Sequence, residues 1–355
     1  MYLIFSPRSP WHHVQRTQNG VRMRLSVKAV VKKIVICFAL LYCFSCLRVL
    51  LPQPIQPMGV VHLARLAVQW QRFPVEKADD TFRKNITVPV SVNVDTLAKH
   101  LNQTWKSNIY SAKDNIDKQF LPVMTAEQRL KMYVTFETFL QACEWANLTY
   151  FLIGGSLLGM YRHHGFIPWD DDIDVAMSAS DWRQIRYVLS HIPGYELYAP
   201  SDVQWKFYMK NLQPIKNKPF RWPNVDIFFY TEDSTYIWGL TTGLKGELFV
   251  KKSDLFPLQY RPFENRNAAA PCNTRDILIN RFDVDLCVSL SYGHKTGASL
   301  ADVKKRPCKE LHGAYPFVFR SPGIDGGMME TLKIGDHVVK NVTLPVSCSS
   351  TFLSG

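Results

Sequence analysis

The stretch Tyr150–Met177, YFLIGGSLLGMYRHHGFIPWDDDIDVAM, constrains the fold more than any other part of this chain. It opens with the apolar run Tyr150–Ile153, which is short enough for a buried strand. The glycines that follow break this run, and Leu157–Tyr161 can then begin a helix. After a turn, Ile167–Val175 forms a second extended run. A strand, a glycine turn, a helix and a second strand within 28 residues indicate a fold of the α/β class.

Three acids alternate along the second extended run. Side chains on a strand alternate between its two faces, so Asp170, Asp172 and Asp174 share one face while Ile173 and Val175 enter the core on the other. Like charges on one face of a sheet repel, and a bound cation would neutralise them. Ligand sets made only of oxygen favour Mg²⁺ or Mn²⁺. The alternative is a solvated acidic turn. Ile173 and Val175 disfavour it, because they hold the three acids on a half-buried strand.

A fourth acid further along the chain is a candidate ligand for the same ion. Asp226 is the only acid in the predicted strand Asn224–Tyr230, although a satisfied turn carboxylate is the alternative. Two divalent ions can clamp the attacking and leaving oxygens of a phosphoryl displacement. We therefore expect Asp172, Asp174 and Asp226 to converge as catalytic, metal-binding carboxylates. Asp171 points to the opposite face, so its replacement by Asn should matter least.

The glycine turn is the candidate phosphate site. Gly154 and Gly155 have no side chain where a backbone would have to approach a phosphate, and the following helix N-terminus offers unpaired N–H groups. Ser156 adds a hydroxyl donor, and a bare strand–turn–helix is the alternative for this segment. Lys206 and Lys210, in a predicted strand downstream, are further candidates for binding a donor phosphate.

The N-terminal third of the chain predicts a membrane anchor and a stem. Residues 1–33 carry seven Lys and Arg and no acid, and residues 34–51 are apolar except for Arg48. This segment is long enough for a spanning helix, and its basic flank predicts a cytosolic N-terminus with the remaining chain in the lumen. Residues 52–120 open with three prolines and predict a stem, which leaves residues 121–355 as the catalytic domain. A cleaved signal peptide is the alternative, but no small-x-small cleavage site follows.

Sequons and cysteines agree with a luminal body. Five cysteines follow the predicted anchor, so at least one of them is free or paired with another chain. All Asn-x-Ser/Thr sequons also lie beyond the anchor, which predicts glycosylation and a single-pass type II protein of the Golgi or endoplasmic reticulum membrane. The four candidate glycosylation sites are Asn85, Asn102, Asn147 and Asn341.

Charge does not suggest a nucleic-acid partner. The chain has 42 Lys and Arg against 30 Asp and Glu, but the first 33 residues account for seven of these bases. The remaining 35 bases form no stripe interleaved with aromatic residues, and no zinc-finger, homeodomain or RRM pattern is present.

The segment GGSLLGMYRHHGFIPWDDDIDVAM resembles the signature of the LicD family, which includes bacterial phosphorylcholine transferases, fukutin and fukutin-related protein. The resemblance extends to VDIFFY, Val225–Tyr230, and more loosely to Leu255–Leu278. It implies a nucleotidyltransferase-like mixed sheet with flanking helices. The family is similar to nucleotidyltransferases of the polymerase-beta type.

Roles follow from the resemblance residue by residue. Residues 154–156 match the phosphate loop. Arg162 matches a basic position that could hold a donor phosphate, and a surface salt bridge is the alternative for it. The positions that match the acidic and metal-binding residues, for Mg²⁺ or Mn²⁺, are Asp170, Asp172, Asp174 and Asp226.

The resemblance implies transfer of a phospho-alcohol, such as phosphocholine or ribitol phosphate, from a CDP-linked donor to a glycan hydroxyl, with CMP leaving. The implied partners are a CDP-alcohol and a glycan acceptor on a glycoprotein or glycolipid. The cysteine-rich zinc insert of fukutin-related protein has no equivalent here. Two alternatives remain: a metal-dependent D-x-D glycosyltransferase that uses a nucleotide-sugar, and an inactive glycan-binding relative.

Overall fold

The computed structural model describes most of the chain beyond residue 86. The described residues are Ile36, Leu244 and the ranges 87–105, 116–200, 204–241, 247–323 and 326–345. Two compact units divide the chain, Met1–Gln71 and Arg72–Gly355, and every element discussed below belongs to the second. The predicted cytosolic tail, nearly all of the predicted anchor and the sequon at Asn85 lie outside the described residues. Among the residues that are described, no helix has the length and apolar character needed to cross a membrane.

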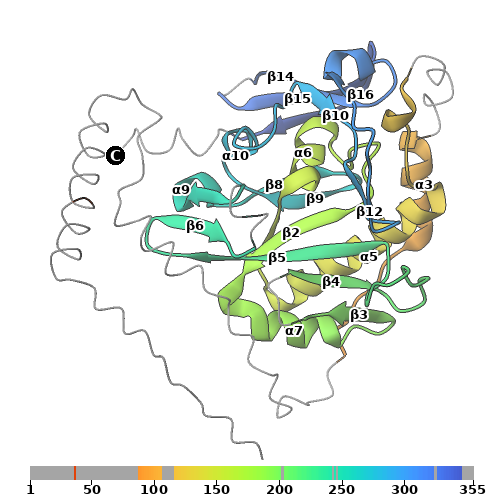
Figure 1. The fold of residues 1–355 in the computed structure, drawn as a ribbon. Helices are drawn as coiled ribbons and strands as arrows, with labels where there is room; N and C mark the ends of the chain where they lie inside the picture. The colour runs from red at the N-terminus through yellow and green to blue at the C-terminus, as the bar shows by residue number, and fades with distance from the viewer. Residues whose placement is uncertain are drawn as a thin grey trace, which may run out of the picture. The chain divides into compact units, whose positions relative to one another are not determined.

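A mixed sheet of seven strands forms the centre of the second unit (Figure 1). Five strands follow the order β1-β2-β5-β4-β3, while β6 pairs with β5 and β7 pairs with β6. Strands β2 and β5 run parallel, and the other described pairs in this sheet are antiparallel. The strands are β1 Tyr150–Leu152, β2 Ile173–Ser178, β3 Tyr195–Tyr198, β4 Gln204–Met209, β5 Asn224–Glu232, β6 Tyr236–Gly239 and β7 Phe249–Lys251.

Helices flank this sheet, which confirms the predicted α/β class with a mixed sheet. The longest, α5, contacts β4 and β5, while α6 contacts β2. The N-terminus of α5 is fixed by the predicted capping box, in which Thr125 and Gln128 each accept a hydrogen bond from the other's backbone N–H. The α-helices are α3 Val94–Trp105, α5 Ala126–Ala146, α6 Gly154–His163, α7 Trp182–Ser190, α9 Lys252–Leu255 and α10 Thr274–Leu278. Short 3-10 segments are η3 Lys118–Phe120, η4 Ala179–Asp181 and η5 Cys308–Leu311.

Part of the range predicted as a stem packs with the body. Helix α3 contacts α5, and Val88, Leu97 and Leu101 are buried in the same core as the central sheet. Burial of three aliphatic side chains is worth several kcal/mol, at about 25 cal/mol per Å² of apolar surface. The segment from residue 87 to 105 is thus attached to the domain by its apolar face.

Smaller sheets cover one side of the central sheet (Figure 1). The hairpin β8–β9 contacts β1 through β9, and the disulfide Cys287–Cys308 joins β10 to the segment after β13. Cys143 is buried and free, in agreement with the expected odd cysteine. The remaining strands are β8 Gln259–Phe263, β9 Arg266–Ala270, β10 Leu286–Val288, β11 Tyr292–Gly293, β12 Ala298–Ser299, β13 Lys305–Pro307, β14 Phe317–Pro322, β15 Met328–Ile334 and β16 His337–Leu344.

A buried carboxylate fastens the sheet β14–β16 to the end of α6. Glu330 on β15 is fully buried, with His164 Nε2 2.8 Å and Arg320 Nε 2.8 Å from its carboxylate oxygens, and Arg261 pairs with it as well. Burial alone would raise the pKa of Glu330. The hydrogen bond with His164 and the charges of Arg261 and Arg320 instead lower that pKa to about 2.

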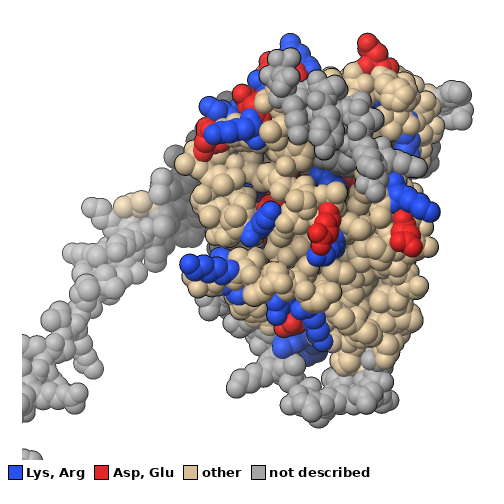
Figure 2. Space-filling view, turned by 90° about the vertical axis from the view of Figure 1, so that its right-hand side faces the viewer, with Lys and Arg blue, Asp and Glu red and all other residues tan. Residues whose placement is uncertain are grey.

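Charged side chains are dispersed over the face that Figure 2 shows. Lys and Arg lie scattered among uncharged residues on this face, with Asp and Glu close to several of them. Surface pairs on the described chain include Lys252 with Glu232 at 2.7 Å and Lys304 with Asp302 at 3.4 Å. Exposed pairs of this kind contribute little to stability, about 0–1 kcal/mol each.

Candidate active site

The acidic run enters the sheet later than the sequence predicts. Strand β2 begins at Ile173, so Asp170 and Asp172 lie in the loop before it and only Asp174 is a strand residue. Ile173 and Val175 are fully buried, as expected, and hold this segment against the core. All three acids nevertheless line one pocket, because the loop leads directly into the strand.

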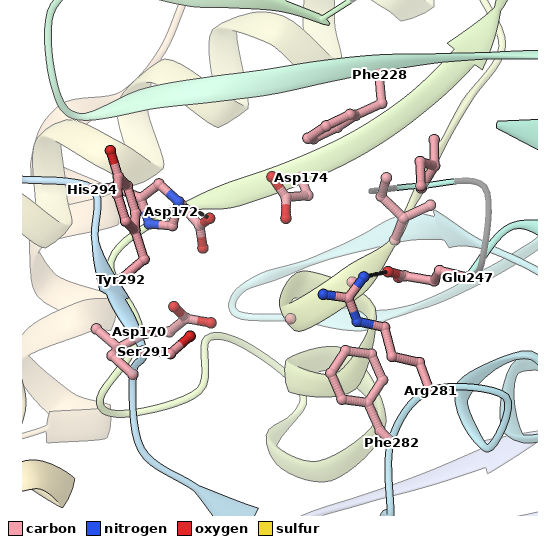
Figure 3. A pocket seen from close by; sticks show the side chains of 15 residues that line it. Asp170, Asp172, Asp174, Phe228, Glu247, Arg281, Phe282, Ser291, Tyr292 and His294 are labelled. Carbon is pink, nitrogen blue, oxygen red and sulfur yellow. Dashed lines mark hydrogen bonds and ion pairs between the residues drawn. The ribbon is translucent and has the colours of Figure 1, made fainter. Parts of the chain in front are cut away.

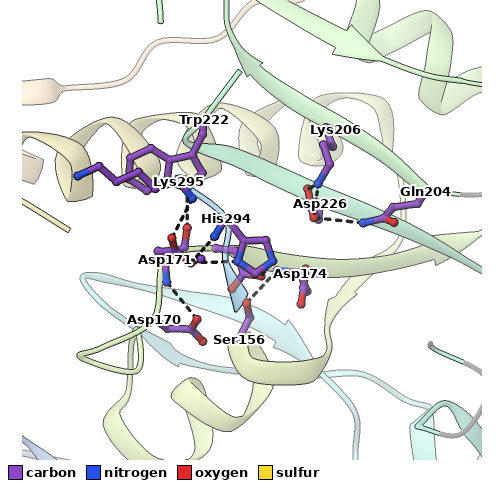
Figure 4. A network of polar contacts seen from close by, with 12 residues as sticks. Ser156, Asp170, Asp171, Asp174, Gln204, Lys206, Trp222, Asp226, His294 and Lys295 are labelled. Atoms are coloured by element: carbon purple, nitrogen blue, oxygen red, sulfur yellow. Dashed lines mark hydrogen bonds and ion pairs between the residues drawn. The ribbon is translucent and has the colours of Figure 1, made fainter. Parts of the chain in front are cut away.

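Strand register brings Asp226 beside Asp174. In the parallel pair β2–β5, Asp174 is the direct partner of Asp226, and in the neighbouring pair β4–β5 the partner of Asp226 is Lys206. Lys206 Nζ lies 2.5 Å from both carboxylate oxygens of Asp226, and Gln204 Nε2 donates to Asp226 Oδ2 at 3.2 Å (Figure 4). Two acids and a lysine therefore form one row across three strands.

The glycine turn makes room for carboxylates at the N-terminus of α6. Gly154 has a φ of 58°, and a Cβ built there would lie 3.1 Å from Asp174 Oδ2. A Cβ on Gly155 would lie 2.7 Å from Asp170 Oδ2. The Ser156 hydroxyl accepts a hydrogen bond of 2.8 Å from the backbone N–H of Asp174. The positive end of a helix dipole stabilises nearby negative charge, so the turn that was predicted to approach a phosphate also supports the acids.

A pocket of about 350 Å³ is bordered by the two glycines and by Asp170, Asp172 and Asp174, whereas Asp226 and Ser156 do not line it (Figure 3). One side holds the three acids, and an aromatic and polar side faces them from later parts of the chain. Such a volume is within the usual range for a small-molecule site. The lining residues are Ile153, Gly154, Gly155, Asp170, Asp172, Asp174, Phe228, Leu244, Glu247, Arg281, Phe282, Leu290, Ser291, Tyr292 and His294.

Electrostatics in the pocket disfavour so many ionised carboxylates without added positive charge. Burial raises the pKa of Asp170 and of Asp174 well above the usual range, and the charge of Asp172 raises both further. Burial also raises the pKa of Asp172, although the charge of His294 opposes this effect. Asp226 contributes to the raised pKa of both Asp172 and Asp174, so these three carboxyl groups interact electrostatically.

Asp171 anchors a loop that closes one side of the pocket. Asp171 lies in the loop before β2 rather than on the opposite face of a strand. It is buried and accepts backbone N–H groups from His294 at 3.2 Å and Lys295 at 3.0 Å. The His294 ring lies between two carboxylates, with Nδ1 3.0 Å from Asp171 Oδ1 and Nε2 3.1 Å from Asp172 Oδ2 (Figure 4). Burial alone would lower the pKa of His294, but the bond with Asp171 and the charge of Asp172 raise it to about 9. The expectation that Asp171 matters least is therefore not supported.

The basic residues predicted to bind a donor phosphate lie elsewhere. Arg162 is buried: its Nη1 contacts the sulfur atoms of Cys287 and Cys308, and its Nη2 donates to two backbone carbonyls. This placement corrects its predicted role, because a guanidinium engaged inside the core does not reach the pocket. Lys206 is paired with Asp226, and Lys210 is exposed just past the end of β4. None of these three basic residues lines the pocket.

The structure locates three of the predicted sequons. Asn147 is the exposed C-cap of α5, between that helix and β1, where the sequence places it in a loop. Asn341 is exposed on β16, and Asn102 lies within α3.

Three ionisable pocket residues were not predicted from the sequence. His294 follows β11, Glu247 precedes β7, and Arg281 follows α10. Each comes from a loop without hydrophobic periodicity or a recognisable motif, so no signal in the sequence marks them.

The chemistry of the four carboxylates suits a hard divalent cation, although these side chains do not converge on one point. Among the described residues, no group of three or more His, Cys, Asp or Glu side chains stands ready to hold a metal ion. Asp226 is turned to Lys206 and Asp172 to His294, so two cationic side chains already balance part of the negative charge. The ligand atoms on offer are all carboxylate oxygens, which Mg²⁺ and Mn²⁺ prefer.

Comparison with known proteins matches the central part of the chain. A family model described as LicD/FKTN/FKRP, nucleotidyltransferase domain, matches residues 147–273. The lipopolysaccharide cholinephosphotransferase LicD of Haemophilus influenzae is 45% identical over 58 residues, which is 16% of this chain and 22% of that protein. The ribitol-5-phosphate transferase FKTN of Mus musculus is 23% identical over 136 residues, 37% of this chain and 28% of its own length. An uncharacterized Caenorhabditis elegans protein is 35% identical over 89 residues, 24% of this chain and 23% of that protein.

These matches are local. The chain spans only between 22% and 28% of the length of these relatives. The matched residues 147–273 contain β1, α6, β2, β4 and β5, and so all four pocket and strand acids, Asp170, Asp172, Asp174 and Asp226. They do not contain Arg281 or His294.

Proposed function

We propose that the protein is a metal-dependent phospho-alcohol transferase, because residues 147–273 match the model of the LicD/FKTN/FKRP nucleotidyltransferase domain. It moves phosphocholine or ribitol phosphate, or a related group, from a CDP-linked donor to a glycan hydroxyl and releases CMP. The relatives named a cholinephosphotransferase and a ribitol-5-phosphate transferase support the transferred class of group.

One observation carries this proposal: the row of acids at the N-terminus of α6. Asp174 is in register with Asp226, and Asp170 and Asp172 join Asp174 in lining the pocket. Carboxylates at this density raise one another's pKa and therefore need added positive charge, which a divalent cation would bring.

Mg²⁺ or Mn²⁺ is the proposed cofactor, held by Asp172, Asp174 and Asp226, with Asp170 beside them. When bound, such an ion neutralises charge that develops on the phosphoryl oxygens during displacement. Asp226 would exchange its contact with Lys206 for this role, and Asp172 its contact with His294.

Residues of the pocket supply the remaining requirements of the reaction, which are a base for the hydroxyl proton and limited access of water. A sugar hydroxyl oxygen forms the new bond to the phosphorus that carries the alcohol, and the bond from that phosphorus to the CMP oxygen breaks. The hydroxyl proton must leave in the same step, and the carboxylates of the pocket are the bases that border this space. The half-enclosed pocket also limits the access of water, which would otherwise compete with the glycan.

A luminal location in the Golgi or endoplasmic reticulum, on a single-pass type II anchor, remains part of the proposal. The exposed positions of Asn147 and Asn341 leave both sequons open to glycosylation. The disulfide Cys287–Cys308 agrees with an oxidising compartment.

CMP release from CDP-choline and CDP-ribitol tests the function directly. The full chain is incubated with each donor in Mg²⁺, in Mn²⁺ or in EDTA, with a panel of glycan acceptors, and Asp174→Asn serves as the inactive control. We expect metal-dependent CMP release with at least one donor. Metal-dependent turnover of a nucleotide-sugar, with both CDP-alcohols untouched, would replace this proposal by glycosyl transfer. Metal binding without turnover of any of these donors would indicate an inactive relative.

A further inference from the structure

Arg281 supplies a cationic group to the pocket on the side away from His294 (Figure 3). Its side chain is 52% exposed. Of the described residues that line the pocket, it is the only Arg or Lys. The guanidinium lies 5.6 Å from the centre of the Phe282 ring, which also lines the pocket. The pocket therefore has an acidic side and a basic side.

Glu247 sets the position of Arg281. The two side chains form an ion pair of 2.7 Å between Arg281 Nη1 and Glu247 Oε2. The Glu247 side chain is only 9% exposed, and its carboxylate lies against the start of α6, where a Cβ built on Gly154 would be 3.5 Å from Glu247 Oε1. Arg281 is thus tied, through Glu247, to the same glycine turn that supports the acids.

A diphosphate donor needs such a group. Carboxylates repel phosphate oxygens, so the acidic side of the pocket cannot by itself hold a pyrophosphate. The other basic candidates do not line the pocket: Arg162 is buried against a disulfide, and Lys206 and Lys210 lie outside the lining. A guanidinium carries five N–H donors in a planar fork that matches phosphate geometry, and Glu247 engages one nitrogen of that fork.

We propose that Arg281, held in place by Glu247, is the phosphate-binding residue for the nucleoside diphosphate part of the donor. This inference rests on the proposed function, because it assigns a subsite to that same pocket. It replaces the assignment of the donor phosphate to Arg162.

Equilibrium binding of CDP and of cytidine to the full chain, in Mg²⁺, separates phosphate recognition from recognition of the nucleoside. We expect Arg281→Gln to weaken CDP binding by about 10-fold or more, the value of a charge-assisted hydrogen bond, and to leave cytidine binding unchanged. Arg281→Lys keeps the charge but loses the fork, so it should recover part of the CDP affinity. The matched control is Arg275→Gln, an exposed arginine on α10 that does not line the pocket.

The outcomes separate this inference from the proposed function. Equal CDP binding by the wild type and Arg281→Gln would overturn the subsite and leave the transferase proposal intact. An equal loss of CDP and cytidine would also overturn it, because Arg281 would then support the pocket in general. If the wild type binds neither, the CDP donor is wrong and inorganic pyrophosphate becomes the probe. A 10-fold weaker pyrophosphate affinity in Arg281→Gln would then sustain the subsite, and no difference would reject it.

Discussion

Replacing Asp171 by Asn removes a buried anchor without changing the size of the side chain. Oδ1 of Asp171 accepts the backbone N–H of His294 and lies 3.0 Å from its ring Nδ1, while Oδ2 accepts the backbone N–H of Lys295. An amide has one oxygen, so its NH₂ group must face at least one of these donors. A buried donor left unsatisfied costs about 1–3 kcal/mol, and a hydrogen bond to a charged group is worth about 1.5–3 kcal/mol.

We therefore expect Asp171→Asn to lower the free energy of unfolding by about 2–3 kcal/mol, in spite of the relief of like-charge repulsion among the acids. Denaturant unfolding of the full chain measures this change, and hydrogen exchange of the His294 and Lys295 amides reports the loop directly. Asp276→Asn, at an exposed position on α10, is the matched control and should stay within about 0.5 kcal/mol of the wild type. CMP release should fall as well, because His294 would lose its place beside Asp172. Unchanged stability together with unchanged amide exchange would refute the anchoring role.

Further predictions concern the acids, the buried glutamate and one sequon. Asp172→Asn and Asp174→Asn should each remove nearly all CMP release while circular dichroism shows a retained fold, and undiminished release by Asp174→Asn would exclude the metal role. Glu330→Gln should destabilise the protein by about 3 kcal/mol at pH 7, as loss of one partner of a buried ion pair does. Because folding lowers the pKa of Glu330 from 4.5 to about 2, its stabilisation is present above pH 4.5 and is lost as pH falls towards 2. The difference between wild type and variant in denaturant unfolding should therefore shrink over that interval, and a constant difference would contradict it. Asn147→Gln, at an exposed helix C-cap, should leave CMP release largely intact in a folded, correctly targeted protein.

Elements with strong local patterns were predictable from the sequence. The capping box of α5, the strand β1 and the strand β5 appear where periodicity and turn residues place them. Helix α6 begins at Gly154 rather than at Leu157, so the two glycines form its first turn. Asp226 was also placed correctly beside Asp174, although 52 residues separate them, because each is the acid of an apolar strand. Two such strands in one sheet bring their polar positions together if they become neighbours in register.

The burial of charged side chains by distant parts of the chain was not predictable from local sequence patterns. Arg162 sits next to the acidic motif in sequence and looked available for a phosphate. The helix that carries it turns the guanidinium into the core, towards the disulfide Cys287–Cys308, which comes from residues more than 120 positions away. Asp171 was expected to matter least because alternation along a strand places it on the opposite face. It lies instead in the loop before β2, where His294 covers its carboxylate, so that carboxylate is buried rather than solvated.

The two sides of the pocket differ in how they are built, and this explains which residues the sequence reveals. The acidic side belongs to β2, the short loop that leads directly into it and the start of α6, all within one continuous stretch of sequence. Glu247, Arg281 and His294 come from three separate loops, whose approach to the pocket depends on long-range contacts such as the Asp171 anchor and the Glu247–Arg281 pair. Function-bearing residues often lie on loops positioned by a rigid scaffold. A change in these loops can therefore alter which donor the pocket accepts while the acid row on the sheet stays the same.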